Sequence, residues 1–126
     1  MIDERRGAVA VVDLLALARV GDAQGPIWAH GGEDLNANLI RLRAGAGVAA
    51  HVNGEVEVLL VGIAGGGIVE VDGRWHELGA GQALVIPKGA LRATEAGDNG
   101  FAYLTCHRRR APLWPENVAH HPPGQR

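Results

Sequence analysis

Residues 45–67, GAGVAAHVNGEVEVLLVGIAGGG, hold side chains whose types and spacing could support chemistry. His51, Glu55 and Glu57 fall within seven residues, an Asn53-Gly54 pair lies between them, and an apolar run ending in glycines follows. Imidazole and carboxylate groups this close together can bind a metal ion or hydrogen-bond a polar ligand. We interpret the stretch as one lip and one wall of a small β-barrel pocket.

The rest of the chain must supply the strands that position this stretch. Its 126 residues predict a single domain that can bury a core without disulfides. Apolar residues make up 47% and aromatic residues 4%, and the 19 glycines favour many turns, a mixture typical of short strands. Residue patterns and turn signals predict strands over residues 27–30, 35–43, 48–52, 55–63, 68–71, 74–78, 83–86, 91–95 and 101–108.

The strand expected over residues 35–43 mixes polar and apolar residues. Alternation places Asn36, Asn38, Ile40 and Leu42 on one face, and the other face is mixed too. Its polar positions therefore face solvent, a neighbouring element or the pocket, and the pattern leaves the choice open.

Two dipeptides predict tight hairpins. Asn53-Gly54 and Asp72-Gly73 both suit two-residue turns, because each position accepts a positive φ. The glycines in the segment GIAGGG, residues 62–67, end a strand with no helix after it, so they indicate bulges and turns and not a phosphate-binding loop.

The spacing of these elements predicts the fold class. Short strands at intervals of eight to twelve residues, with no helix longer than two turns, favour an all-β antiparallel barrel or double-sheet jelly roll. Residues 1–24 would form an N-terminal arm, with a short strand over 8–12 and a helical turn over 14–19 capped by Asp13. Residues 25–110 would form the barrel, and residues 111–126, with four prolines, a tail that cannot continue the sheet.

Charge and composition exclude some classes of binding partner. A net charge of −2 gives no broad attraction to a polyanion, so nucleic acid is not an expected partner. No apolar stretch is long enough to span a membrane, and the N-terminus lacks a cleavage pattern. The single cysteine, Cys106, excludes an internal disulfide and suits a reducing compartment. We expect a cytoplasmic protein with a small-molecule partner.

The central stretch resembles the first sequence motif of the cupins, G-x5-H-x-H-x3-E-x6-G. Gly45, His51 and Glu57 fall in register with it, and Asn53 stands at the second His. The closing glycine, Gly65, lies eight residues after the Glu, one later than the motif requires.

The second cupin motif, G-x5-P-x-G-x2-H-x3-N, fits a later stretch. Gly81, Pro87 and Gly89 match its scaffold positions, whereas Arg92 and Ala96 replace its His and Asn. Together the two motifs cover residues 45–96. The resemblance implies a cupin barrel with a pocket between its strands, and it suggests a homodimer, because small barrels of this family commonly pair.

The resemblance also implies where a metal would bind. In metal-dependent cupins three His and one Glu hold iron, manganese, nickel, copper or zinc. This chain keeps His51 and Glu57 and has Asn53 and Arg92 at the other two positions. An arginine ~5 Å from a dication would cost roughly 7 kcal/mol at an effective dielectric of about 20, which disfavours the family's usual site. His107, in phase with Tyr103, could substitute as a ligand if its face points inward.

Three functions remain open, and the sequence does not decide whether the protein is an enzyme. The first is a pocket for a small anionic molecule, in which Arg92 holds the anion and His51, Glu57 and Asn53 contact the rest. The second is a metal-dependent oxygenase or isomerase with His51, Glu57, Asn53 and His107 as ligands. The third is a regulatory or structural subunit with a vestigial pocket.

Overall fold

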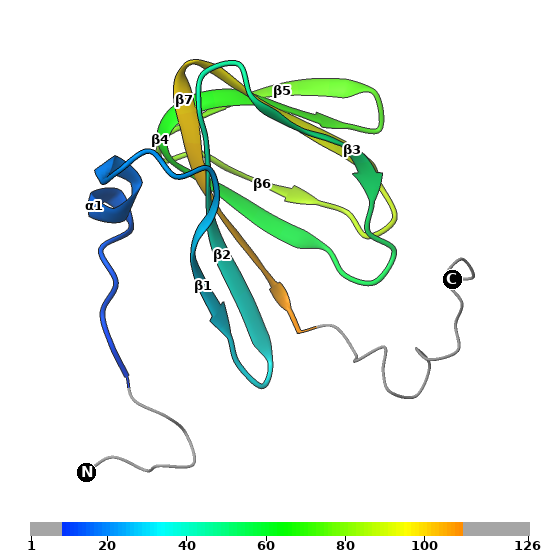
Figure 1. Cartoon of the computed structure of the whole chain (residues 1–126). Coiled ribbons are helices and arrows are strands. Elements are labelled where there is room, and N and C mark those ends of the chain that lie inside the picture. The colour runs from blue at the N-terminus through cyan, green and yellow to red at the C-terminus, as the bar shows by residue number, and fades with distance from the viewer. Residues whose placement is uncertain (1–8, 110–126) are drawn as a thin grey trace, which may run out of the picture.

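The computed structural model describes residues 9–109, which form an all-β structure with one short helix (Figure 1). The predicted tail, residues 111–126, and the first eight residues lie outside the described part. The elements are α1 (Leu14–Arg19), β1 (Gly25–Gly31), β2 (Leu35–Leu42), β3 (Gly47–Val52), β4 (Val58–Val71), β5 (Arg74–Gly79), β6 (Ala83–Ile86) and β7 (Leu91–Arg108). Within the described range no helix is long and apolar enough to cross a membrane.

The strands form one antiparallel seven-stranded sheet folded into two layers (Figure 1). The order is β1-β2-β7-β4-β5, with β3 added on β7 and β6 on β4. The long strands β4 and β7 pair with each other along most of their lengths and belong to both layers. The first layer contains β1, β2, β6, the start of β4 and the end of β7. The second contains β3, β5, the end of β4 and the start of β7.

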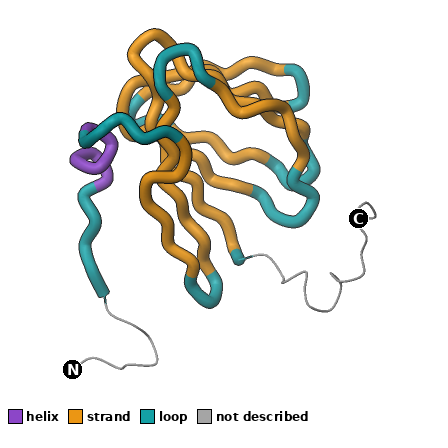
Figure 2. Tube along the Cα trace, viewed as in Figure 1, coloured by secondary structure: helices purple, strands orange, loops and turns teal. Residues whose placement is uncertain are grey.

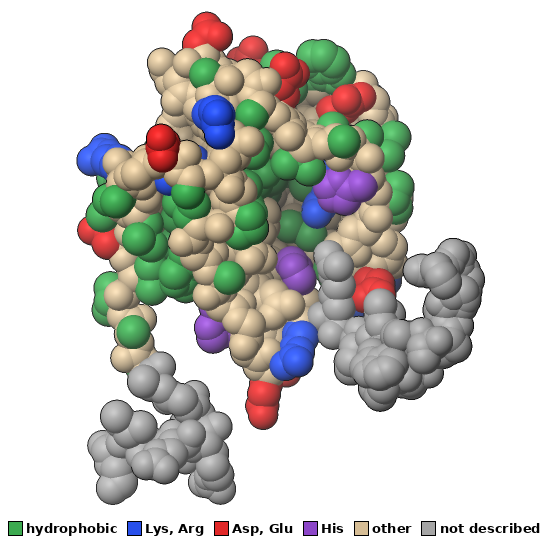
Figure 3. Space-filling model, viewed as in Figure 1, with side chains coloured by type: hydrophobic (Ala, Val, Ile, Leu, Met, Phe, Trp, Pro, Cys, Tyr) green, Lys and Arg blue, Asp and Glu red, His purple; other side chains and the backbone are tan. Residues whose placement is uncertain are grey.

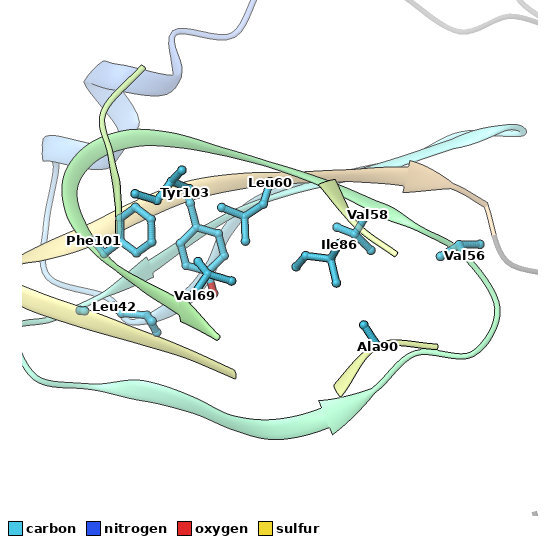
Figure 4. Close-up of a cluster of buried hydrophobic side chains, with 11 residues drawn as sticks. Leu42, Val56, Val58, Leu60, Val69, Ile86, Ala90, Phe101 and Tyr103 are labelled. Carbon is cyan, nitrogen blue, oxygen red and sulfur yellow. The ribbon is translucent and has the colours of Figure 1, made fainter. Parts of the chain in front are cut away.

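The core fills the space between the layers. In β4, Val58 and Leu60 are buried while Leu59 between them is exposed, so side chains alternate between the inner and outer faces. Phe101 and Tyr103 of β7 extend the core, with ring centroids 4.8 Å apart. Figure 4 shows these side chains pointing into the interior together with those of the second layer. The buried cluster comprises Leu42, Val56, Val58, Leu60, Val69, Leu78, Ile86, Ala90, Ala96, Phe101 and Tyr103.

The predicted helical turn is confirmed. Asp13 caps α1 by accepting a hydrogen bond from the backbone N–H of Ala16 at 3.0 Å. The helix lies outside the two layers (Figure 2), where Arg41 of β2 donates to the carbonyls at its C-terminal end, including that of Val20 at 2.7 Å. The strand expected before it is not found, since residues 9–12 pair with no strand.

Of the two predicted hairpins, one is confirmed and one is wrong. Asp72 and Gly73 have φ of 50° and 84°, and they join β4 to β5 in a tight turn with Val71 opposite Arg74. Neither Asn53 nor Gly54 has a positive φ, and β3 pairs with β7 instead of β4. The pairing across the barrel overrides the local turn preference, so residues 53–57 are a crossing between the layers.

Two interruptions expected in the sheet are also absent. The sequence predicts separate strands over residues 55–63 and 68–71, but β4 is continuous through its glycines, with register shifts between Gly62 and Ala64 and between Gly65 and Gly67. A Cβ at Gly62 would meet the carbonyl oxygen of Gly79, so this position needs a glycine for close approach. Residues 91–95 and 101–108 likewise belong to the single strand β7.

Candidate functional site

Strand β7 runs through both layers, and several polar side chains on one of its faces point toward the interior. Thr94 pairs with Val69, which is fully buried, and Arg92 pairs with Val71, which packs on the core. Paired residues share a face, so Arg92 and Thr94 point inward. Both are half-buried. In the other half of β7 the same face carries Tyr103, Thr105 and His107.

His51 lies directly opposite Arg92 on β3. The Arg92 Nε–H donates to His51 Nε2 at 3.0 Å, and His51 Nδ1 lies 3.0 Å from the carbonyl oxygen of Ala49. Because a guanidinium can only donate, Nε2 must carry the lone pair, and Nδ1 must carry the proton that it donates to Ala49. The imidazole is thereby assigned as the neutral Nδ1–H tautomer, fixed on both sides.

Polar side chains also face inward from the first layer. Asn36 pairs with His107, and Asn38 pairs with Thr105. All four are half-buried, on the same face as the core residues Leu42 and Phe101. The sequence placed both asparagines on one face with Ile40 and Leu42 but left the direction of that face open. Leu42 belongs to the buried cluster between the layers, whereas Ala37 and Leu39 on the opposite face are buried outside that cluster, so the face with the asparagines is the inner one.

Tyr103 lies at the base of this polar surface. Burial raises the pKa of its hydroxyl above the usual 10.0, while a hydrogen bond with the Thr94 side chain and the positive charge of Arg92 lower the pKa in part. The tyrosine is therefore neutral near pH 7 and close enough to Arg92 for that charge to act on it. Tyr103 and Thr94 were not predicted as site residues from the sequence. The alternation of apolar residues around Tyr103 does indicate which face of the strand this side chain occupies.

We call this set of residues the inner site: Arg92, Thr94 and Tyr103, with Asn36, Asn38, Thr105 and His107, and with His51 exposed at its edge. Figure 3 shows a hollow on the corresponding side of the molecule, with hydrophobic side chains in its depth and histidine and basic side chains at its edge. An apolar floor beneath a few convergent polar groups is the usual composition of a small-molecule site.

The two glutamates do not join the inner site. Val56 and Val58 are 3% and 1% exposed, and Glu57 between them is exposed, as alternation requires for a side chain on the outer face. Glu55 is exposed as well. The structure brings His51 and Arg92 together but leaves both carboxylates outside.

Asn53 has a structural role in the crossing between the layers. Its Oδ1 accepts hydrogen bonds from the backbone N–H groups of Glu55 at 2.9 Å and Val56 at 3.4 Å, and its own carbonyl accepts one from Gly89. The amide oxygen that the cupin resemblance offered as a metal ligand is thus turned onto the backbone. Its Nδ2 is buried and has no hydrogen-bond partner.

The donors present do not fit a metal ion of the kind that the resemblance implied. The His51 lone pair already accepts from Arg92, and the Asn53 oxygen holds a turn. His107 faces inward, and with its Nδ1 2.8 Å from the carbonyl oxygen of Arg108 its Nε2 can offer a lone pair, but this is a single donor. Across residues 9–109 no three His, Cys, Asp or Glu side chains gather as a metal-binding group.

Comparison with solved structures identifies the fold. The chain superposes on the protein TT1209 from Thermus thermophilus with a TM-score of 0.68 and 23% identity, covering 80% of this chain and 98% of that one. A cupin protein from Bacteroides fragilis gives 0.60 and 21%, over 83% and 94% of the two chains. No protein-family model and no curated protein matches the sequence.

A third match is to an enzyme. A variant of salicylate 1,2-dioxygenase from Pseudoaminobacter salicylatoxidans, solved in complex with gentisate, gives a TM-score of 0.55 and 23% identity. The match covers 59% of this chain and 20% of the dioxygenase. These likenesses define an all-β protein of the double-sheet barrel class. The chain has the cupin fold, which confirms the resemblance read from its glycines and proline.

Proposed function

We propose that the protein binds a small anionic molecule between its two layers, with Arg92 as the anion-binding group. The observation that carries the proposal is the Arg92–His51 pair on the inner face. The hydrogen bond from Nε–H to His51 orients the guanidinium plane. Nε–H is one of five N–H donors of a guanidinium, and the two terminal nitrogens carry the other four, in the fork that suits a carboxylate or phosphate.

The surroundings of Arg92 support the same ligand class. The hydroxyls of Thr94 and Tyr103 lie on the same face, and the apolar side chains beneath them can contact a carbon skeleton. Partial burial strengthens the attraction between the guanidinium and an anion, because the effective dielectric falls away from bulk water. The dioxygenase of the same fold was solved with gentisate, an organic anion, which agrees with this ligand class.

The proposal keeps two of the residues predicted from the sequence and leaves two out. His51 and Arg92 act together, with His51 as a positioning residue. Glu57 and Asn53 have no part in the pocket, because the first lies on the outer face and the second holds a turn. No catalytic role is assigned to any of the four.

The test is a binding experiment with matched arginine variants. Small carboxylates and sugar phosphates are screened by thermal shift, and the strongest is titrated calorimetrically. A hydrogen bond to a charged group contributes about 1.5–3 kcal/mol, so Arg92→Gln should lower the affinity for the anion about tenfold or more. Arg43→Gln, an exposed arginine outside the inner site, should leave affinity unchanged. Equal affinity for wild type and Arg92→Gln would refute the proposal, and stabilisation by none of the anions would favour the vestigial pocket.

The predicted homodimer has a candidate surface on the outer face of the first layer. Cys106, Leu59 and Val85 follow one another in register across β7, β4 and β6, beside Ala37 of β2, which is already buried. Leu59 is 40% exposed and Val85 is 54% exposed. We propose that a second copy covers this face, since an isologous contact needs only one such patch. Light scattering should give a dimer for the wild type and for Val20→Arg, and a monomer for Leu59→Arg. A dimer that survives Leu59→Arg would exclude this surface.

A further inference from the structure

A groove of about 420 Å³ lies on the outer face of the second layer, on the opposite side of the sheet from the inner site. It crosses β3, β7, β4 and β5. Ala93 lies in its floor, and because Ala93 alternates with Arg92 and Thr94 along β7, the groove and the inner site occupy opposite faces of one strand. Thr94 of the inner site borders the groove as well, but Arg92, His51 and Tyr103 do not line it, so a ligand there would not contact the proposed anion-binding group.

The walls of the groove are apolar and include an exposed aromatic ring. Ile68 and Ala93 form the floor, and the Trp75 side chain, 66% exposed, stands at one side. The opposite side is the backbone around Gly45 and Gly47, where missing side chains keep the groove open. Trp75 is the most exposed of the Phe, Tyr and Trp side chains within residues 9–109, and its indole ring is accessible to a ligand in the groove.

Two carboxylates share this cavity with the indole. Glu70 lies directly opposite Trp75 in the β4–β5 pair and directly opposite Ala93 in the β4–β7 pair. Glu95 lies opposite Ile68. Glu70 is half-buried, so its charge is partly withdrawn from solvent. Within the described part of the chain, no Lys, Arg or His lines the groove.

We propose that this groove is a second ligand site, which takes a small organic cation whose ammonium group carries apolar substituents. The face of an indole attracts such a cation through its quadrupole, and the two carboxylates supply the opposite charge. The apolar floor contacts the substituents, and the volume lies in the range of small-molecule sites. This site is independent of the anion site, whose failure would leave it untouched.

The experiment compares choline with 3,3-dimethylbutan-1-ol, which has the same shape but carbon in place of the charged nitrogen. Each is titrated into the full chain while the indole N–H resonance of Trp75 is followed, that resonance being assigned by its loss in Trp75→Leu. Choline should shift the resonance with a Kd of roughly millimolar order, and the neutral compound should bind several-fold more weakly. Raising the salt concentration should weaken choline binding and leave the neutral compound unchanged.

Two variants separate the charge from the ring. Glu70→Gln keeps the size of the side chain but removes its charge, so it should lower the affinity for choline about fivefold. Trp75→Leu, followed through backbone amides of the groove, should weaken it about two- to fivefold. Glu33→Gln, an exposed glutamate in the β1–β2 turn, is the matched control and should change nothing. Equal affinity for choline and its neutral analogue, or choline binding unaffected by Glu70→Gln, would overturn the proposal.

Discussion

The Arg92–His51 pair makes a prediction about a single proton. In the structure His51 donates from Nδ1 to the carbonyl of Ala49 and accepts at Nε2 from Arg92. The other neutral tautomer would lose both hydrogen bonds and turn its Nε2–H toward the guanidinium donor. A net hydrogen bond contributes about 1 kcal/mol, and we take the charged one at the same value because His51 is exposed. Together they favour the Nδ1–H tautomer by about 2 kcal/mol, or roughly thirtyfold.

The tautomer can be read directly from ¹⁵N shifts of the imidazole nitrogens at about pH 8, where neutral imidazole predominates in general. We expect a protonated Nδ1 and an unprotonated Nε2 at His51. Arg92→Leu removes one of the two bonds and should lower the tautomer ratio to roughly fivefold. His30, exposed on β1, serves as an internal control whose tautomer ratio does not respond to Arg92→Leu. A protonated Nε2 in the wild type would refute the assigned pair and remove the basis for an oriented Arg92.

Three further outcomes follow from burial and backbone geometry. Because burial raises the pKa of Tyr103 above 10.0, its neutral form is favoured in the folded state, and this contribution to stability is lost as pH rises above about 10, so Tyr103→Phe should flatten the fall in Tm above about pH 10. The comparison uses a Cys106→Ala background, since burial also raises the pKa of that thiol, and an unchanged slope would contradict it. Leu60→Ala should lower the free energy of unfolding by about 2–5 kcal/mol in urea titrations, and a loss under about 1 kcal/mol would mean that Leu60 is not core. Gly54→Ala should lower the free energy of unfolding by less than about 0.5 kcal/mol, whereas Gly73→Ala, at φ 84°, should lower it by about 1 kcal/mol. Equal losses for the two variants would contradict the difference in backbone conformation between the two sites.

The two Asx-Gly pairs show where local reasoning succeeds. Asp72-Gly73 joins strands that are neighbours in the sheet, so the turn preference and the tertiary pairing agree. At Asn53-Gly54 they conflict, because β3 finds its partner in β7, about forty residues later in the chain. The same asparagine then uses its side chain to cap the crossing. Nothing in a window of a few residues distinguishes the two cases.

The site residues divide in the same way. Motif register selected His51 and Arg92, and the structure places them opposite each other. Register also selected Glu57, but the direction of a strand side chain depends on which face meets the other layer. The buried valines on either side of Glu57 set that direction.

The sequence alone determined where most of the strand residues lie, the helical cap at Asp13 and the cupin scaffold, because these depend on alternation, turn chemistry and fixed glycine and proline positions. The tertiary structure alone decided which face of each strand is inside, which strands continue through glycines, and that the His51 lone pair is taken by Arg92. Those facts depend on contacts between residues far apart in the chain, and a side chain moves from core to solvent when its register changes by one residue.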